Sequence, residues 1–129
     1  MPVRYSIDTE TRVIHTRMIG VMTPEDVREH FAELRDDPKC EGTLYVLMDA
    51  IELTSIPTLA MIQFTKDMVE FMRGKVRFAA VAVAAVNSAQ FGMFRMGQVI
   101  LESVFGPTNV FRDLDSAREW LEQQRRANG

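Results

Sequence analysis

Hydrophobic and polar residues follow two different periods along this chain, and the changes between them mark out the predicted elements. Apolar and polar side chains alternate over residues 3–8 and again over 12–19, on either side of Thr9, Glu10 and Thr11. Alternation of period two is typical of half-buried strands, and a short polar connection between two of them indicates a β-hairpin. The N-terminal part of the chain is therefore predicted to form two antiparallel strands.

The first predicted helix follows a break at Gly20. Thr23 is expected as its N-cap and Pro24 as its first helical residue, and the two acidic residues that follow favour the positive end of the helix dipole. We expect this helix to end near Leu34. Its apolar stripe is narrow, so one side should lie on a sheet while the outer side faces water. The stripe consists of Val27, Phe31 and Leu34.

The rest of the chain alternates between predicted strands and helices. In order, we expect a strand over 43–49, a helix from about 57 to 73 with Gly74 as a left-handed C-cap, an alanine-rich strand over 76–86, a helix over 88–105 ended by Gly106, a strand over 109–111, and a last helix capped by Asp115. This order predicts one α/β domain over residues 1–129, with a mixed β-sheet of about five strands flanked by about four helices.

The helices predicted at 57–73 and 88–105 carry more apolar residues than one sheet face requires. In each of them the polar side chains form a single narrow stripe, and methionine, phenylalanine and branched aliphatic residues occupy the remaining surface. Leaving about four such side chains in water would forgo roughly 6–12 kcal/mol of burial. That loss is comparable to the whole net stability of a typical domain, about 5–15 kcal/mol. Something is therefore expected to cover these surfaces.

Three kinds of cover remain open at this stage. The two helices can pack on each other, a second copy of the chain can cover them in a homodimer, or a lipid-like small molecule or membrane surface can bind there. For the third case the expected contacts lie between the two helices, with Arg95 either bound to an anionic head group or extended along the rim. The candidate ligand-binding residues on these helices are Met61, Phe64, Met68, Phe94 and Arg95.

Asp49 is the best candidate for a functional polar residue, because it ends a buried strand where open α/β domains place their binding crevices. Two other roles stay open for it. It can cap the backbone of the following residues, or it can serve as the general base of a small enzyme. Thr54, Ser55 and Thr58 can each cap the next helix, and Thr58 is also a candidate for regulatory phosphorylation, since an anion is favoured at a helix N-terminus.

Composition and motifs exclude several other classes of function. The net charge of −3 gives no reason to expect a nucleic-acid partner, and the chain lacks phosphate-loop, dinucleotide, nucleophile-elbow and zinc-helix motifs. His15, His30 and the single Cys40 form no metal-binding spacing. We therefore expect no catalytic residue, no metal and no cofactor. A lone cysteine and the absence of a signal-peptide core at the N-terminus favour the cytoplasm.

The order of elements resembles that of the SpoIIAA-like members of the STAS superfamily. The matching segments are Gly20 before Thr23-Pro24-Glu25-Asp26, Leu47-Met48-Asp49, the small-residue strand Ala79-Ala80-Val81-Ala82-Val83, Val104-Phe105, and Ser116-Ala117-Arg118-Glu119-Trp120-Leu121. The resemblance covers nearly the whole chain. It implies a mixed sheet flanked by helices and a binding or signalling role rather than catalysis.

The wide apolar surfaces of the two helices and this resemblance together lead to two functional hypotheses. In the first, the chain is a non-enzymatic domain that binds an apolar or amphipathic small molecule, or a peripheral membrane surface, between the helices at 57–73 and 88–105. In the second, it is a protein-interaction module of the anti-sigma factor antagonist type. Aligned without gaps from Asp49, Thr58 falls at the phosphorylatable serine of those relatives, although Pro57, Leu59 and Ala60 replace the acidic and glycine residues around it.

Overall fold

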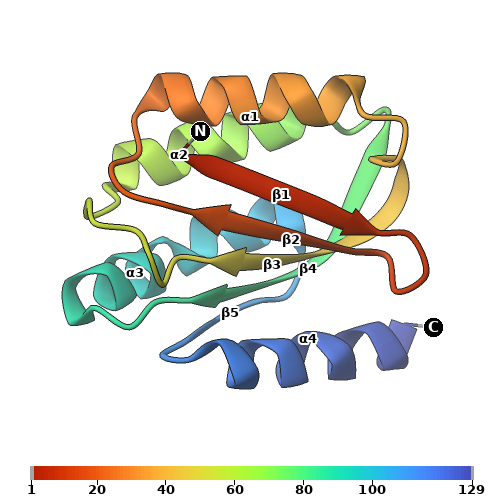
Figure 1. The fold of residues 1–129 in the computed structure, drawn as a ribbon. Coiled ribbons are helices and arrows are strands. Elements are labelled where there is room, and N and C mark those ends of the chain that lie inside the picture. Colours follow the sequence, from red (N-terminus) through yellow and green to blue (C-terminus); the bar gives the residue numbers. More distant parts are fainter. Residues whose placement is uncertain (1, 129) are drawn as a thin grey trace.

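A computed structural model describes residues 2–128, which form one five-stranded sheet and four helices. The strand order follows the sequence; the first two strands are antiparallel and every other neighbouring pair is parallel (Figure 1). This is the mixed α/β architecture predicted from the sequence. The elements are β1 (Val3–Asp8), β2 (Val13–Met18), α1 (Pro24–Asp36), β3 (Gly42–Asp49), α2 (Leu59–Glu70), β4 (Val76–Ala84), α3 (Ser88–Phe105), β5 (Thr108–Phe111) and α4 (Leu114–Asn128).

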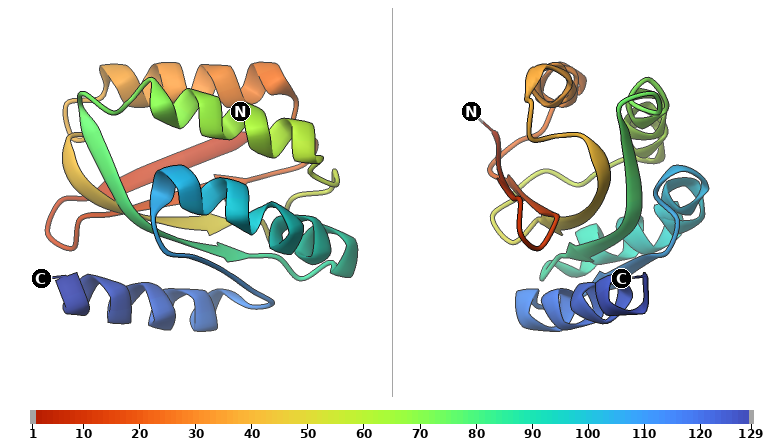
Figure 2. Two further views of the ribbon diagram at one scale, coloured as in Figure 1. Left: turned by 180° about the vertical axis from the view of Figure 1, so that it is seen from behind. Right: turned by 90° about the vertical axis from the view of Figure 1, so that its right-hand side faces the viewer.

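The helices divide unequally between the two faces of the sheet. Helices α1, α2 and α3 pack on one face, while α4 alone packs on the other, as the two views in Figure 2 show. The larger core therefore lies under three helices. On the α4 side, Ala80, Ala82 and Ala84 of the inner strand β4 are fully buried and contact the region of Ala117 and Leu121. Small side chains let α4 approach the sheet closely, as the alanine-rich strand predicted.

The beginning of α1 confirms the capping expected from its sequence. The Thr23 side chain accepts a hydrogen bond from the Asp26 backbone N–H, and the Asp26 carboxylate accepts one from the Thr23 backbone N–H. This reciprocal capping box satisfies two donors that a helix start would otherwise leave unpaired, and Pro24 adds its preset backbone angle. The first turn of α1 is thus held in helical geometry by its own capping residues.

Two of the predicted helix ends are wrong. Helix α2 ends at Glu70 with Phe71 as its C-cap, and Gly74 does not adopt the left-handed conformation expected of it. At the start of α4, the capping carboxylate belongs to Asp113, which accepts from the Ser116 backbone N–H, and not to Asp115. In both cases a nearby residue caps the helix instead of the predicted one. The local path of the backbone decides which candidate can reach the free backbone groups at the helix end. Gly106, with a φ of 72°, does end α3 as predicted.

Candidate functional site

A cavity of about 190 Å³ lies between the sheet and the helices α1 and α2, with part of α3 at its inner end. Strands β2 and β3 contribute alternate side chains to its floor, because successive residues of a strand point to opposite faces. The roof comes from the inner stripes of α1 and α2. The wall consists of Val3, Ile14, Thr16, Met18, Met22, Val27, His30, Phe31, Leu34, Val46, Met48, Leu53, Ser55, Ile56, Pro57, Thr58, Met61, Ile62, Thr65, Phe78, Phe94, Leu101 and Phe105.

The cavity opens at the carboxyl-terminal edge of the parallel strands, beside Ile56. This side chain lines the cavity and is also 54% exposed. Two loops meet there: the Met22 backbone N–H donates to the Ser55 hydroxyl at 3.0 Å, and Gly20 bridges to Leu53. The two loops at the mouth are therefore joined by backbone pairing and by the Ser55 side chain. Three further exposed apolar side chains lie on or beside these loops, namely Val21, Ile51 and Leu59.

Two of the five helix residues predicted to bind a ligand line this cavity. Met61 reaches it from the first turn of α2, and Phe94, which is 4% exposed, contributes to its wall from α3. The regulatory candidate Thr58 lies at the mouth, where its hydroxyl accepts a hydrogen bond from the Met61 backbone N–H at 3.1 Å. Thr58 therefore caps α2, which is one of the two roles that the sequence predicted for it.

The other three predicted helix residues lie elsewhere. Phe64 is half-buried, with the Arg28 guanidinium 5.5 Å from the centre of its ring. Met68 is half-buried on α2 and is not part of the cavity wall. Arg95 is exposed and extends along α3 to within 6.0 Å of the Phe91 ring. Arg95 does not line the cavity, and its binding of an anionic head group stays a prediction.

The cavity does not lie between α2 and α3, where the sequence placed the expected ligand. These two helices pack tightly, because Gly97 of α3 lies directly against Ile62 of α2: a Cβ added at Gly97 would overlap Ile62 Cδ1 and lie 3.0 Å from its Cγ2. Helix packing therefore covers this part of the apolar surface. The outer surface remains uncovered, with Phe71 82%, Val99 78% and Met96 65% exposed.

Asp49 faces away from the cavity. The neighbouring Met48 lines the cavity, so Asp49 points to the other face of the sheet. There its Oδ1 accepts a hydrogen bond from the Ile51 backbone N–H at 3.1 Å, and its Oδ2 lies 3.3 Å from His15 Nε2. The local capping role is present. The structure separates this histidine–aspartate pair from the cavity by the thickness of the sheet.

Sequence reasoning missed His30, a cavity residue on α1. It follows Val27 by three positions and precedes Leu34 by four, so it lies on the same helical stripe as these two core residues. This spacing in the sequence could have identified His30 as a residue on the inner side of α1. Burial lowers the pKa of the His30 imidazole from 6.5 to about 4, because desolvation penalises the charged form. The side chain is therefore neutral at neutral pH.

The part of the chain that the structure describes holds neither a metal-binding cluster nor a membrane-spanning helix. Within residues 2–128, no group of three or more histidine, cysteine, aspartate or glutamate side chains is arranged to hold a metal ion. None of the helices in this same part of the chain has the length and apolar character needed to span a membrane.

Comparisons with known proteins agree with this architecture. The model of the SpoIIAA-like family matches residues 13–122. The structure is similar to the crystal structure of an uncharacterized protein of the DUF3478 family, with a SpoIIAA-like fold, from Shewanella loihica PV-4. The TM-score is 0.61 at 17% sequence identity, over 92% of this chain and 91% of that protein. At this identity the likeness concerns the fold alone. No curated protein matches the sequence.

Proposed function

Because this chain belongs to the SpoIIAA-like family, we propose that it is a binding domain rather than an enzyme. Its ligand is an apolar or amphipathic small molecule held between the sheet and the helices α1 and α2. The observation that carries this proposal is the cavity of about 190 Å³ with its predominantly apolar wall. Small-molecule sites are typically concave and mostly apolar, with a few polar groups that set orientation.

The apolar wall of this hollow supports a ligand. Because the hollow opens to solvent, a ligand displaces water from apolar side chains, and each Å² of apolar surface removed from water gains roughly 25 cal/mol. A bound apolar molecule would gain this free energy over the surface that it buries. The exposed Val21, Ile56 and Leu59 near the mouth provide an apolar approach for such a molecule.

Binding of toluene, measured by calorimetry or by NMR chemical shifts, tests the proposal. The wild-type chain should bind this probe, and Val46→Phe should abolish binding, because Val46 faces the cavity from β3 and a phenyl ring would occupy it. The matched control is Val13→Phe on β2, whose side chain packs on the α4 side of the sheet. Equal binding by wild type and Val46→Phe, or no binding by the wild type, would contradict the proposal.

Native ligands and membrane association can be tested with the same protein. Native mass spectrometry after purification without detergent should show an added small mass in the wild type but not in Val46→Phe. Co-sedimentation with liposomes tests whether the apolar side chains at the mouth contact a membrane surface. Replacing Ile56 with aspartate should weaken any such association, since this side chain is exposed at the mouth.

A regulated protein-interaction module is the second candidate. It is favoured by the exposed position of Thr58 at the N-terminus of α2, where a phosphate would meet the positive end of the helix. Thr58→Glu should then release a partner captured by the wild type, while Thr58→Ser should retain it. If partner capture is the same with glutamate at this position, a switch at Thr58 is ruled out.

A further inference from the structure

His30 is the one ionisable side chain that lines the cavity, counting the wall residues within 2–128. The imidazole lies between two aromatic rings, with ring centres 5.4 Å from Tyr5 and 5.3 Å from Phe31. Its Nδ1 atom is buried and has no hydrogen-bond partner within the described part of the chain. Buried polar atoms in native proteins are almost always hydrogen-bonded, so an exception indicates a missing partner.

The neighbouring protein groups do not supply that partner. None of the four hydroxyl side chains in the wall bonds to Nδ1: Ser55 accepts from the Met22 N–H, Thr58 accepts from the Met61 N–H, and Thr65 donates to the Met61 carbonyl. No hydrogen bond to Nδ1 holds the imidazole in its present orientation. A half-turn of the ring exchanges Nδ1 with Cδ2 and Nε2 with Cε1, so a nitrogen can be presented to either side of the ring.

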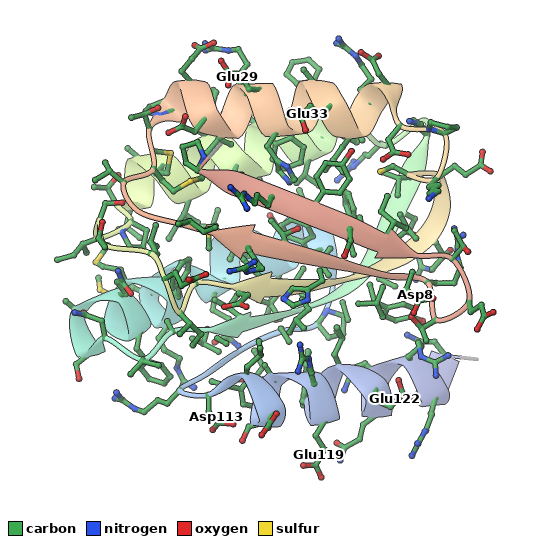
Figure 3. The ribbon with its side chains drawn as sticks, in the orientation of Figure 1. Asp8, Glu29, Glu33, Asp113, Glu119 and Glu122 are labelled. Carbon is green, nitrogen blue, oxygen red and sulfur yellow. The ribbon has the colours of Figure 1, made fainter. Side chains whose placement is uncertain are left out.

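The cavity wall is unsuited to a charged ligand. Within residues 2–128 it contains no aspartate, glutamate, lysine or arginine. The acidic residues of α1 near His30 are Asp26, Glu29 and Glu33, which line a separate small hollow and not the cavity. Glu29 and Glu33 are exposed on the helix (Figure 3). An ionised head group inside the cavity would lose its hydration without gaining a partner charge. The ligand polar group must therefore be neutral.

We propose that the ligand is an uncharged molecule with a small apolar body and one hydroxyl group that hydrogen-bonds to the His30 imidazole. A hydroxyl can donate to an unprotonated ring nitrogen and accept from a protonated one, so it suits either neutral tautomer. The volume limits the buried body to about one small ring or a short alkyl chain, since an apolar cavity of about 150 Å³ admits benzene. This inference rests on the proposed function and specifies the ligand class for the same cavity.

Phenol and toluene test this inference, because they have nearly the same shape and differ by a hydroxyl in place of a methyl group. The measured quantity is the ratio of the toluene Kd to the phenol Kd, compared between the wild type and variants, so that differences in water solubility cancel. In His30→Phe, which keeps an aromatic ring beside Tyr5 and Phe31, the ratio should fall about tenfold, the scale of one hydrogen bond. In His30→Gln, which keeps a donor and an acceptor, the ratio should stay closer to the wild-type value.

The chain offers a matched control in its other histidine. His15 lies on the opposite face of the sheet beside Asp49, so His15→Phe should leave the ratio unchanged. In the wild type, phenol should shift the imidazole ¹⁵N signals of His30 and leave those of His15 in place, while toluene should shift neither nitrogen strongly. This spectroscopic measurement needs no variant, so it tests the inference even if a substitution at position 30 prevents folding.

The possible results separate the inference from the proposed function. If the wild type binds neither probe, the proposed function itself fails. If it binds both, with the same ratio in His30→Phe and no phenol-specific shift at His30, the cavity is a binding site but the hydroxyl inference is overturned. Tighter binding of benzoate than of phenol would overturn the requirement for an uncharged ligand. A fall in the ratio confined to His30→Phe, with the shift at His30, supports the inference.

Discussion

The two glycines inside α3 provide a sharp test of how closely α2 and α3 pack. An added Cβ at Gly92 would have no atom within 4 Å, whereas one at Gly97 would overlap the Ile62 side chain of α2. Replacing either glycine with alanine in a helix interior should gain about 1 kcal/mol from helix propensity. The two substitutions should therefore differ only through the contact with Ile62.

The expected difference follows from the geometry at Ile62. Its Cδ1 would overlap the new methyl group and its Cγ2 would lie 3.0 Å away, so the whole side chain must move rather than one flexible end. Overpacking of this kind typically costs about 1–3 kcal/mol. Gly92→Ala should thus raise the free energy of unfolding by about 1 kcal/mol, and Gly97→Ala should lie about 1–3 kcal/mol below it.

Urea unfolding followed by circular dichroism measures this difference, provided that the denaturant slopes of the two variants agree. In an Ile62→Ala background the overlap disappears, so Gly97→Ala should become about as stabilising as Gly92→Ala, which gives a clear coupling energy in the double-mutant cycle. Equal stabilisation by both alanines in the wild-type background would refute the close packing of α2 and α3. It would also reopen the space between these helices as a ligand site.

Two further predictions concern pH and oligomeric state. The His30 pKa is about 4 in the folded chain, against 6.5 for an ordinary histidine, so the unfolded chain binds more protons between these two pH values. The free energy of unfolding should therefore fall as the pH falls through this window, by at most roughly 3 kcal/mol. NMR titration of the two imidazoles should place the His30 midpoint near pH 4, and a midpoint near 6.5 would contradict its burial. If a second copy covers the exposed Phe71, light scattering should give a dimer mass for the wild type and a monomer mass for Phe71→Asp. A monomer mass for both would exclude a homodimer at this surface.

The sequence predicted most of the fold because its signals act over a few residues. The Thr23–Pro24 helix start, the break at Gly106 and the alternation of the first two strands each specify local backbone geometry, and the structure confirms them. The C-cap at Gly74 and the cap at Asp115 were wrong. Helix ends are decided by which of several adjacent candidates reaches the free backbone groups, and sequence patterns do not resolve a shift of a few residues.

The candidate site was only partly predictable. The wide apolar arcs of α2 and α3 correctly indicated apolar surface beyond the needs of one sheet face, as the exposed Phe71, Met96 and Val99 demonstrate. The location of the cavity was missed. Asp49 was singled out because it ends a strand, but the alternation of side chains places it on the face opposite the cavity. His30 was passed over, although its spacing from Val27 already placed it on the inner stripe of α1.

By itself, the sequence determined which side of each element is apolar and where the chain turns, because these properties depend on side chains within one or two helical turns of each other. Only the tertiary structure decided which apolar surfaces meet. Gly97 brings α2 and α3 into contact, while the two helices α1 and α2 leave a cavity above the sheet. The distance between two helices depends on the combined packing of side chains far apart in the sequence, and the burial that keeps His30 neutral arises in the same way.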